Sequence, residues 1–422
     1  MSLAERRGLR LFTFSAMFFA QGIGWGLTAV VIPAHLGSRG VKMSGTATVL
    51  AISVLPFAFK WVWGPLMDAF TIERLGRRRP WLIFTQGMMA VSLAALLLVD
   101  DLVASFDLLL VLMLVHTIFN AMQNVATDAL ALDLLSESER GRANGLMYGF
   151  KYGGGVVAST GISLLDLDIK TSIAVLSAVL AAITLVPLLV REHAGTPPPR
   201  RPLGEIVGAL GRVLRVPAVL VAGLAMLCIN LGGGVLASLS PVLFTQDLHW
   251  DDHEYSKLAG IGLAAGFTGS LLAGFVADKL GHRRLAALGV VLLGTVWLGW
   301  ALAYPWWASR WVSYPLFVLE PFSQSTMIVA LFTVCMDTTT KPTATTQFAF
   351  YTSLMNCSQL VASYVLVPVV KTWSYRAIYF GAAAAQVVLL GVVALIDVHQ
   401  AKRALTPGVD TPPGSARAPS RT

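Results

Sequence analysis

The chain has 422 residues, of which 55% are hydrophobic and only 13% are charged. Soluble domains carry roughly a quarter charged residues, so a chain this long and this apolar cannot bury its side chains in one aqueous core and needs lipid as part of its solvent. The formal charge of +8 does not indicate nucleic-acid binding, because the basic residues form short clusters between apolar runs and no extended basic surface.

Apolar runs of about 20 residues, the length that crosses a bilayer, follow one another along the chain. They predict membrane-spanning helices at 11–34, 44–67, 81–99, 106–134, 143–165, 171–190, 217–240, 256–278, 285–304, 313–336, 345–369 and 376–398. The sequence therefore predicts an all-α membrane protein of about twelve transmembrane helices.

A Pro-rich, basic stretch divides these helices into two sets of six. We expect an N-terminal bundle at 1–190, a linker at 191–216, a C-terminal bundle at 217–400 and a disordered tail at 401–422, which is rich in Pro, Ser, Thr and Gly. Within the linker, Leu203 to Leu214 has apolar residues at helical spacing and is expected to lie at the membrane surface.

The distribution of Lys and Arg predicts the orientation of the chain in the membrane. Most of the 31 basic residues lie in the termini and in the loops on the same side as the N-terminus. Because cytoplasmic loops are enriched in Lys and Arg, both termini are expected to be cytoplasmic.

Two short segments repeat after the second helix of each half. Gly64 and Asp68 precede the run 75–79, and 274–284 repeats the same phrase without the insertion. This pattern resembles the G-x-x-x-D-x-x-G-[RK]-[RK] loop of the major facilitator superfamily. The resemblance implies two pseudo-symmetric six-helix bundles and a cytoplasmic gate formed by Gly64, Asp68, Gly76, Arg77, Arg78, Asp133, Gly274, Asp278, Gly281, Arg283 and Arg284.

The segments 59–68, 123–135, 139–145 and 344–351 resemble one branch of that superfamily, the AmpG-related group. This group contains muropeptide permeases, acetyl-coenzyme A transporters and siderophore importers of the RhtX/FptX type. The resemblance implies a bacterial inner-membrane importer of a polar or amphiphilic solute, working as a monomer.

Several charged residues fall inside the predicted helices, where each needs a partner or a function. Asp128 and Lys151 lie at similar depth, and we expect an ion pair between them, either structural or involved in coupling. Glu320 has no basic residue nearby in sequence and is either a satisfied structural carboxylate or a proton carrier. Lys60, Asp133 and Asp337 lie near helix ends and are expected to snorkel or to pair at the gate.

Amides, aromatic residues and one histidine share helical faces with these charges, and they predict a polar cavity near the pseudo-twofold axis. The cavity residues expected are Gln21, Trp25, His116, Asn120, Gln123, Asn124, Tyr148, Gln324, Tyr351, Asn356 and Gln359.

Nothing in the sequence indicates an enzyme, a cofactor or a metal site. The only cluster of metal-ligand residue types, 250–254, lies in an outward loop and is interpreted as solvated charge. No Walker loop is present, so we expect a secondary transporter driven by proton symport. The alternatives are a facilitator or exporter of drugs or metabolites, and a PucC-like assembly factor that binds a pigment or lipid.

Overall fold

The computed structural model describes residues 2–41, 43–70, 72, 75–165, 167–192, 203–340, 343–366, 368, 372–398 and 400. The expected disorder of the 401–422 tail and the Pro-rich part of the linker lie outside the described residues. Within them, all regular elements are helices, as the sequence predicts, and two isolated β-bridges are the only strand-type pairing.

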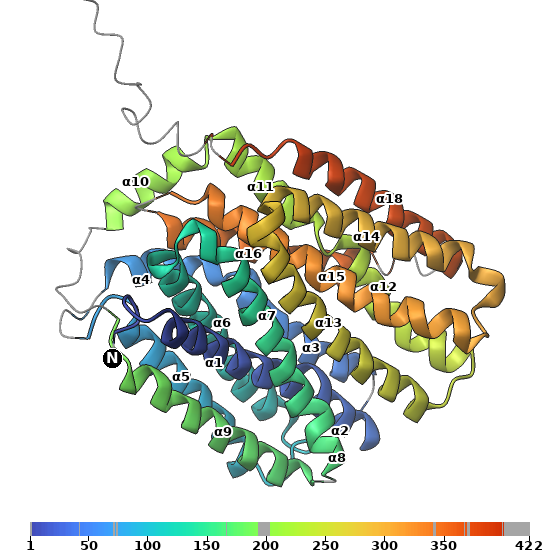
Figure 1. Ribbon diagram of the computed structural model, residues 1–422. Coiled ribbons are helices and arrows are strands. Elements are labelled where there is room, and N and C mark those ends of the chain that lie inside the picture. Colours follow the sequence, from blue (N-terminus) through green and yellow to red (C-terminus); the bar gives the residue numbers. More distant parts are fainter. Residues whose placement is uncertain are drawn as a thin grey trace, which may run out of the picture.

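The first half of the chain contains long helices that are extended or interrupted by short helical turns (Figure 1). These are α1 (Arg7–Gly26) with η1 (Leu27–Val31) and α2 (Ile32–Ser38), α3 (Met43–Ala58) with η2 (Lys60–Val62) and α4 (Trp63–Ala69), α5 (Arg79–Ala94) with η3 (Ala95–Leu98), α6 (Phe106–Leu134), η4 (Glu137–Glu139), α7 (Arg140–Val156) with η5 (Val157–Gly161) and α8 (Ile162–Leu164), and α9 (Ile169–Leu189).

The second half begins after the amphipathic helix α10 (Leu203–Val213), which contacts α4. Its elements are α11 (Pro217–Cys228), α12 (Leu231–Val242) with η6 (Leu243–Asp247), α13 (Asp252–Leu280), α14 (His282–Leu302), η7 (Tyr304–Trp306), α15 (Arg310–Thr338), α16 (Ala344–Val361) with η8 (Ala362–Leu366), and α18 (Tyr375–Ala394).

Ten helical segments of the described residues are long and apolar enough to cross a membrane. The other two predicted spans, 143–165 and 345–369, coincide with α7–α8 and with α16–η8, which are helical over a similar length but richer in glycine and polar residues. Both pack against the opposite half, α7 on α13 and α16 on α3 and α4. Since protein covers them, they need less apolar surface than a helix that faces lipid.

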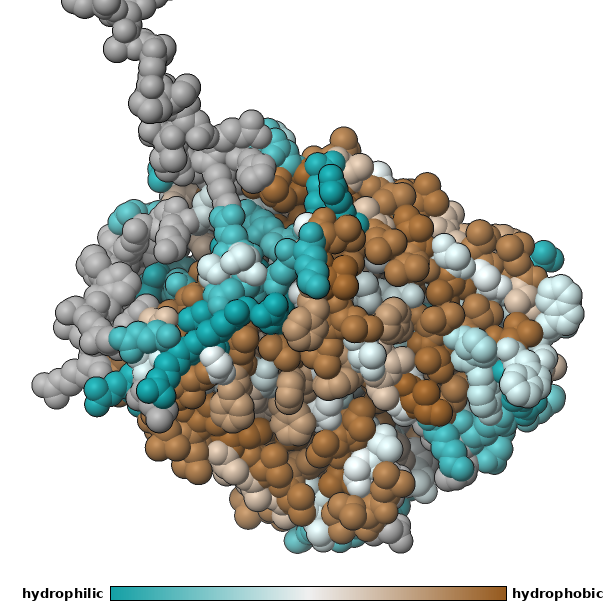
Figure 2. Space-filling view, viewed as in Figure 1, coloured by the Kyte–Doolittle hydropathy of each residue, from teal (hydrophilic) through white to brown (hydrophobic). Residues whose placement is uncertain are grey.

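The outer surface matches a lipid environment. Figure 2 shows a brown, apolar zone over the middle of the bundle and teal, polar residues gathered towards its two ends. Large apolar side chains of the spans, such as Leu98 and Val387, are mostly exposed. A soluble protein does not expose so much apolar surface, whereas a membrane protein covers it with lipid tails.

The two ends of the bundle are distinguished by their loops. The N-terminal face carries the start of α1, the loop between α4 and α5, and the loop between α6 and α7. The opposite face carries the loops that precede α6, α9 and α15. Figure 1 shows the long helices running side by side from one face to the other.

Candidate functional site

The first repeat forms a buried ion cluster at the N-terminal face. Arg78 is 1% exposed; its guanidinium donates to Asp68 at 2.6 Å and to Asp133 at 2.9 Å. It also donates to Thr345 at 2.7 Å, at the start of α16 in the other half. Burial by itself lowers the pKa of this guanidinium, but Asp133 and Asp68 more than offset it and raise that pKa. Arg78 therefore stays charged and joins the two halves.

The second repeat shares a glycine at positive φ with the first but has a looser set of contacts. Gly76 and Gly281 both adopt positive φ, +105° and +89°, which explains glycine at both positions. Asp278 lies opposite the first turn of α7, as Asp68 lies opposite the first turn of α16. Its partner in the repeat is not an arginine: His282 lies 3.9 Å away, and Arg283 is exposed and donates to the Ala394 carbonyl.

Further contacts close the N-terminal face between the halves. Arg140 donates to Asp337 at 2.9 Å, and Asp337 also contacts His282 at 2.5 Å. One turn further along α7, Asn144 donates to Thr333 of α15 at 3.2 Å. Asp337, expected to snorkel or pair at a gate, thus bridges α7 and α14.

The closed contact continues to the middle of the bundle. The Trp61 N–H donates to Ser353 at 3.1 Å, and Asn356 donates to the Phe57 carbonyl at 3.4 Å. In the described part of the chain, every hydrogen bond recorded between α1–α9 and α11–α18 lies in this N-terminal half of the membrane or near its middle. The structure is thus closed at the N-terminal face.

A chain of buried amides runs through the first half. Gln123 donates to Gln86 at 3.1 Å, Gln21 donates to Gln123 at 2.7 Å, and Asn124 donates to Gln21 at 3.0 Å. Asn124 in turn accepts a hydrogen bond from Lys60. Three of the residues expected in the cavity, Gln21, Gln123 and Asn124, are therefore at most 3% exposed and satisfied by protein partners in this conformation.

The expected ion pair of Asp128 and Lys151 needs correction. The lysine within ion-pair distance of Asp128 is Lys60, at 4.0 Å. Pro56 interrupts the hydrogen bonding of α3, and the following turn η2 carries Lys60 inward, where it is 3% exposed and does not snorkel. Lys151 interacts with Asp128 electrostatically, but its ammonium lies over the rings of Tyr148 and Phe57, at 5.6 and 5.9 Å from their centres.

Four other expected cavity residues are buried in packing. Tyr148 packs edge-on against Phe332 of the other half, with ring centres 4.8 Å apart. Tyr351 is fully buried and accepts hydrogen bonds from Gln347 and Thr338. His116 Nδ1 contacts Ser92 and the Met89 carbonyl, while its Nε2 and the Asn120 Oδ1 have no recorded hydrogen bond.

The remaining expected residues are at least partly accessible. Trp25 is 40% exposed, and Gln324, Asn356 and Gln359 are half-buried. Glu320 is also half-buried and accepts a hydrogen bond from the Trp297 indole at 2.9 Å. This indole partner was not predicted, because Trp297 and Glu320 are 23 positions apart and the sequence gives no signal for the contact between α14 and α15.

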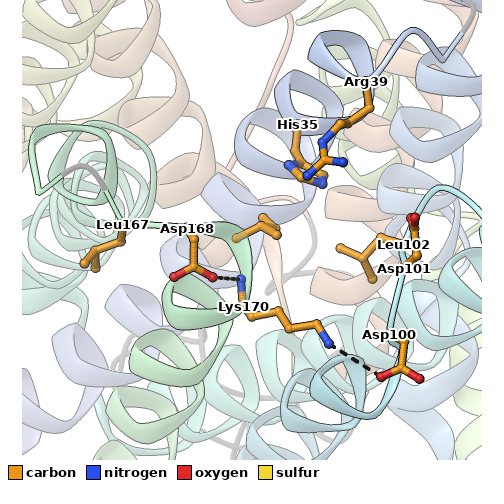
Figure 3. A pocket seen from close by; sticks show the side chains of 9 residues that line it. His35, Arg39, Asp100, Asp101, Leu102, Leu167, Asp168 and Lys170 are labelled. Atoms are coloured by element: carbon orange, nitrogen blue, oxygen red, sulfur yellow. Dashed lines mark hydrogen bonds and ion pairs between the residues drawn. The ribbon is translucent and has the colours of Figure 1, made fainter.

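Two surface cavities lie outside this central region. One, of about 490 Å³ at the opposite face, is lined by His35, Arg39, Asp100, Asp101, Leu102, Leu167, Asp168, Ile169 and Lys170, whose side chains are drawn in Figure 3. Its charges satisfy one another: Lys170 lies 3.8 Å from Asp100, and Asp168 caps α9. The other, of about 770 Å³, lies at the N-terminal face and contains Arg283, Arg284 and Asp337. Neither contains a residue expected in the central cavity.

The cluster 250–254, interpreted as solvated charge, contributes a contact at the opposite face. Glu254 accepts two hydrogen bonds from Arg310, both at 3.0 Å, and one from Tyr314 at 2.5 Å. These hydrogen bonds lower the pKa of Glu254 to about 2. Arg310 also lies over the Trp250 ring, 5.2 Å from its centre. No group of three possible metal ligands occurs among the described residues.

The fold is that of known transporters. The structure superposes on the human organic anion transporter MFSD10 with a TM-score of 0.74 at 15% identity, covering 91% of this chain and 98% of that one. It superposes on the transporter FucP in its outward conformation with a TM-score of 0.70 at 13% identity, covering 92% and 98%. At these identities the likeness shows the fold alone, which confirms the predicted fold class.

Sequence relatives include permeases. The chain is 27% identical over 280 residues to the anhydromuropeptide permease of Escherichia coli K12. The aligned region covers 65% of this chain and only 56% of the permease. It is 22% identical over 371 residues to the putative transporter AmpG 4 of Rickettsia conorii, covering 82% and 87%. The family model of the Major Facilitator Superfamily matches residues 14–363 and 222–419. The chain is thus a multi-pass integral membrane protein that belongs to the Major Facilitator Superfamily.

Proposed function

We propose that this protein imports a polar or amphiphilic solute, of the muropeptide or siderophore kind, by proton symport. The distant similarity to the anhydromuropeptide permease supports the solute class. The halves 1–190 and 217–400 move against each other about a central site, and the protein works as a monomer in a bacterial inner membrane. The N-terminal face is cytoplasmic, in keeping with its excess of Lys and Arg.

The environment of Glu320 is the observation that supports coupling to protons. It lies within the membrane-spanning helix α15, and the neutral side chains of Trp297 and Trp300 are its partners among the described residues. A carboxylate without a cationic partner in such a place is costly when ionised. Binding and release of a proton there can be linked to the alternation between the two faces.

The two repeats form the gate of this transporter. In the present conformation the contacts of Asp68, Arg78 and Asp337 hold the N-terminal face closed. Import requires that these contacts break after solute and proton have entered from the opposite side, so the gate biases which face is open.

The test is uptake of labelled anhydromuropeptide into vesicles that contain the purified protein. We expect an inward proton gradient to drive accumulation and a protonophore to abolish it. Glu320→Gln is expected to lose gradient-driven accumulation but to keep exchange of labelled for unlabelled solute. Glu5→Gln, a matched change at an exposed carboxylate, is expected to behave as the wild type. Accumulation that survives the protonophore would exclude proton symport.

A further inference from the structure

Two lysines within the membrane-spanning part of the first half share one carboxylate. Lys60 and Lys151 both interact with Asp128, and among the described residues no other carboxylate acts on either lysine. Two ammonium groups therefore share one carboxylate inside the membrane. A buried charge without a counter-ion is expensive, so the second cation calls for an explanation.

The two lysines differ in how well they are satisfied. Lys60 is within ion-pair distance of Asp128 and also donates to Asn124. The recorded contacts of the Lys151 ammonium are the faces of two aromatic rings. Aromatic faces attract a cation but accept no N–H hydrogen bond of ordinary strength. The excess positive charge therefore resides at Lys151.

Lys151 is not fully enclosed by the protein. Its side chain is half-buried and stands over Phe57, whose carbonyl accepts a hydrogen bond from Asn356 of the opposite half. Phe57 and Asn356 are half-buried too. This point is where α3 of the first half meets α16 of the second, at the inner limit of the closed contacts. An anion placed here meets the ammonium of Lys151 close to the boundary between the halves.

We propose that Lys151 binds a carboxylate of the transported solute, which supplies the counter-ion that the described residues do not provide. This inference rests on the proposed function only in that the chain transports a solute; it holds for any coupling ion and either direction. Lys60 and Asp128 stay paired and hold the site in place.

The first experiment needs no solute. A cation without a counter-ion costs free energy, so Lys151→Met is expected to melt at the same temperature as the purified wild-type protein or higher. Lys60→Met leaves Asp128 without its close partner and is expected to melt several degrees lower. A large loss of stability in Lys151→Met would make this lysine a structural partner of Asp128 and would overturn the proposal.

The second experiment compares carboxylates with their amides. The probes are muramyl dipeptide, N-acetyl dipeptides and short hydroxy acids, each with its carboxamide, added to the protein in detergent without any gradient. We expect carboxylates to raise the melting temperature at concentrations at least ten-fold below their amides. The preference should disappear in Lys151→Met and persist in Lys257→Met, a change at an exposed lysine.

The outcomes separate this proposal from the proposed function. Equal stabilisation by acid and amide throughout, or a preference that survives Lys151→Met, overturns the role of Lys151. If carboxylates are preferred but uptake does not depend on the proton gradient, the role of Lys151 is supported. Only the proposed proton symport is then contradicted.

Discussion

Arg78 and Arg283 occupy equivalent positions in the two repeats but have different surroundings. Arg78 is buried against Asp68 and Asp133, whereas Arg283 is exposed. Loss of one partner from a buried ion cluster costs about 3–5 kcal/mol, and loss of an exposed charge costs little. We expect Arg78→Gln to lower the melting temperature strongly and Arg283→Gln to leave it nearly unchanged, as measured by fluorescence melting in detergent. Similar losses in both variants would contradict the asymmetry of the repeats.

Glu254 provides a test by pH at the opposite face. Its folded pKa of about 2 is below the usual 4.5, so its contribution to stability is present above the usual value and is lost as the pH falls through about 2. Glu254→Gln is expected to cost about 1 kcal/mol or less, as for other exposed pairs. The gap in melting temperature between the variant and the wild type should stay constant from pH 8 to pH 5.

Asp107→Asn, a change at an exposed carboxylate near the same face, is the control for loss of charge alone. A gap between wild type and Glu254→Gln that already closes at pH 5 would show that Arg310 and Tyr314 do not hold Glu254 ionised.

The partners of single residues were only partly predictable from the sequence. The pairing of Asp68 with arginine follows from the repeat, because both partners lie in one short loop. The pairing of Asp128 with Lys60 does not, because it depends on how η2 turns the chain after Pro56. Helical spacing places residues on faces of their own helix, but it gives no rotation of that helix against its neighbours.

At the scale of elements, the two halves share π-helical turns that the sequence did not predict. Wide π-helical turns occur in η1 and η5 of the first half and in η6 and η8 of the second. They follow α1, α7, α12 and α16, which are the first and fifth helices in the predicted order of each half. Such turns disturb the regular hydrogen bonding and often mark functional sites. All four lie towards the opposite face, where bending would open or close that end.

The crossing of α7 and α13 makes the closure of the N-terminal face testable. A Cβ atom at Gly274 would lie 2.8 Å from the Gly145 Cα and 2.9 Å from the Gly141 carbonyl, so only glycine permits this approach. Gly274→Val is expected to force the helices apart at a cost of about 1–3 kcal/mol. Spin labels at Ser138 and Lys279, both exposed on this face, should then report a longer mean distance.

Gly391→Val is the matched control, since a Cβ there meets nothing within 4 Å. An unchanged distance distribution in Gly274→Val would mean that the contact of α7 with α13 does not limit closure.

For the whole molecule, the sequence predicted the class of fold well because lipid imposes a length on each helix and the repeat marks the two halves. It did not predict which face is closed, because closure depends on contacts between residues nearly 200 positions apart, such as Arg140 and Asp337. Polar contacts of this kind between the halves must break during each cycle.

Asp337 takes part in closing this face through a single side chain, which contacts Arg140 of the first half and His282 of the second. Asp337→Asn is expected to weaken both contacts, and a loss of about 1 kcal/mol would raise the population open at the N-terminal face roughly five-fold.

The measurement is the rate at which a thiol reagent labels a cysteine introduced by Thr333→Cys. Thr333 is buried and hydrogen-bonded to Asn144. The native cysteines Cys228, Cys335 and Cys357 are replaced by serine in this background. The control is Glu139→Gln, which likewise loses two basic partners at this face, but both of them, Arg7 and Arg10, come from its own half. Faster labelling in Asp337→Asn alone supports a gate between the halves. Equal labelling rates in the two variants would mean that Asp337 does not control the opening of this face.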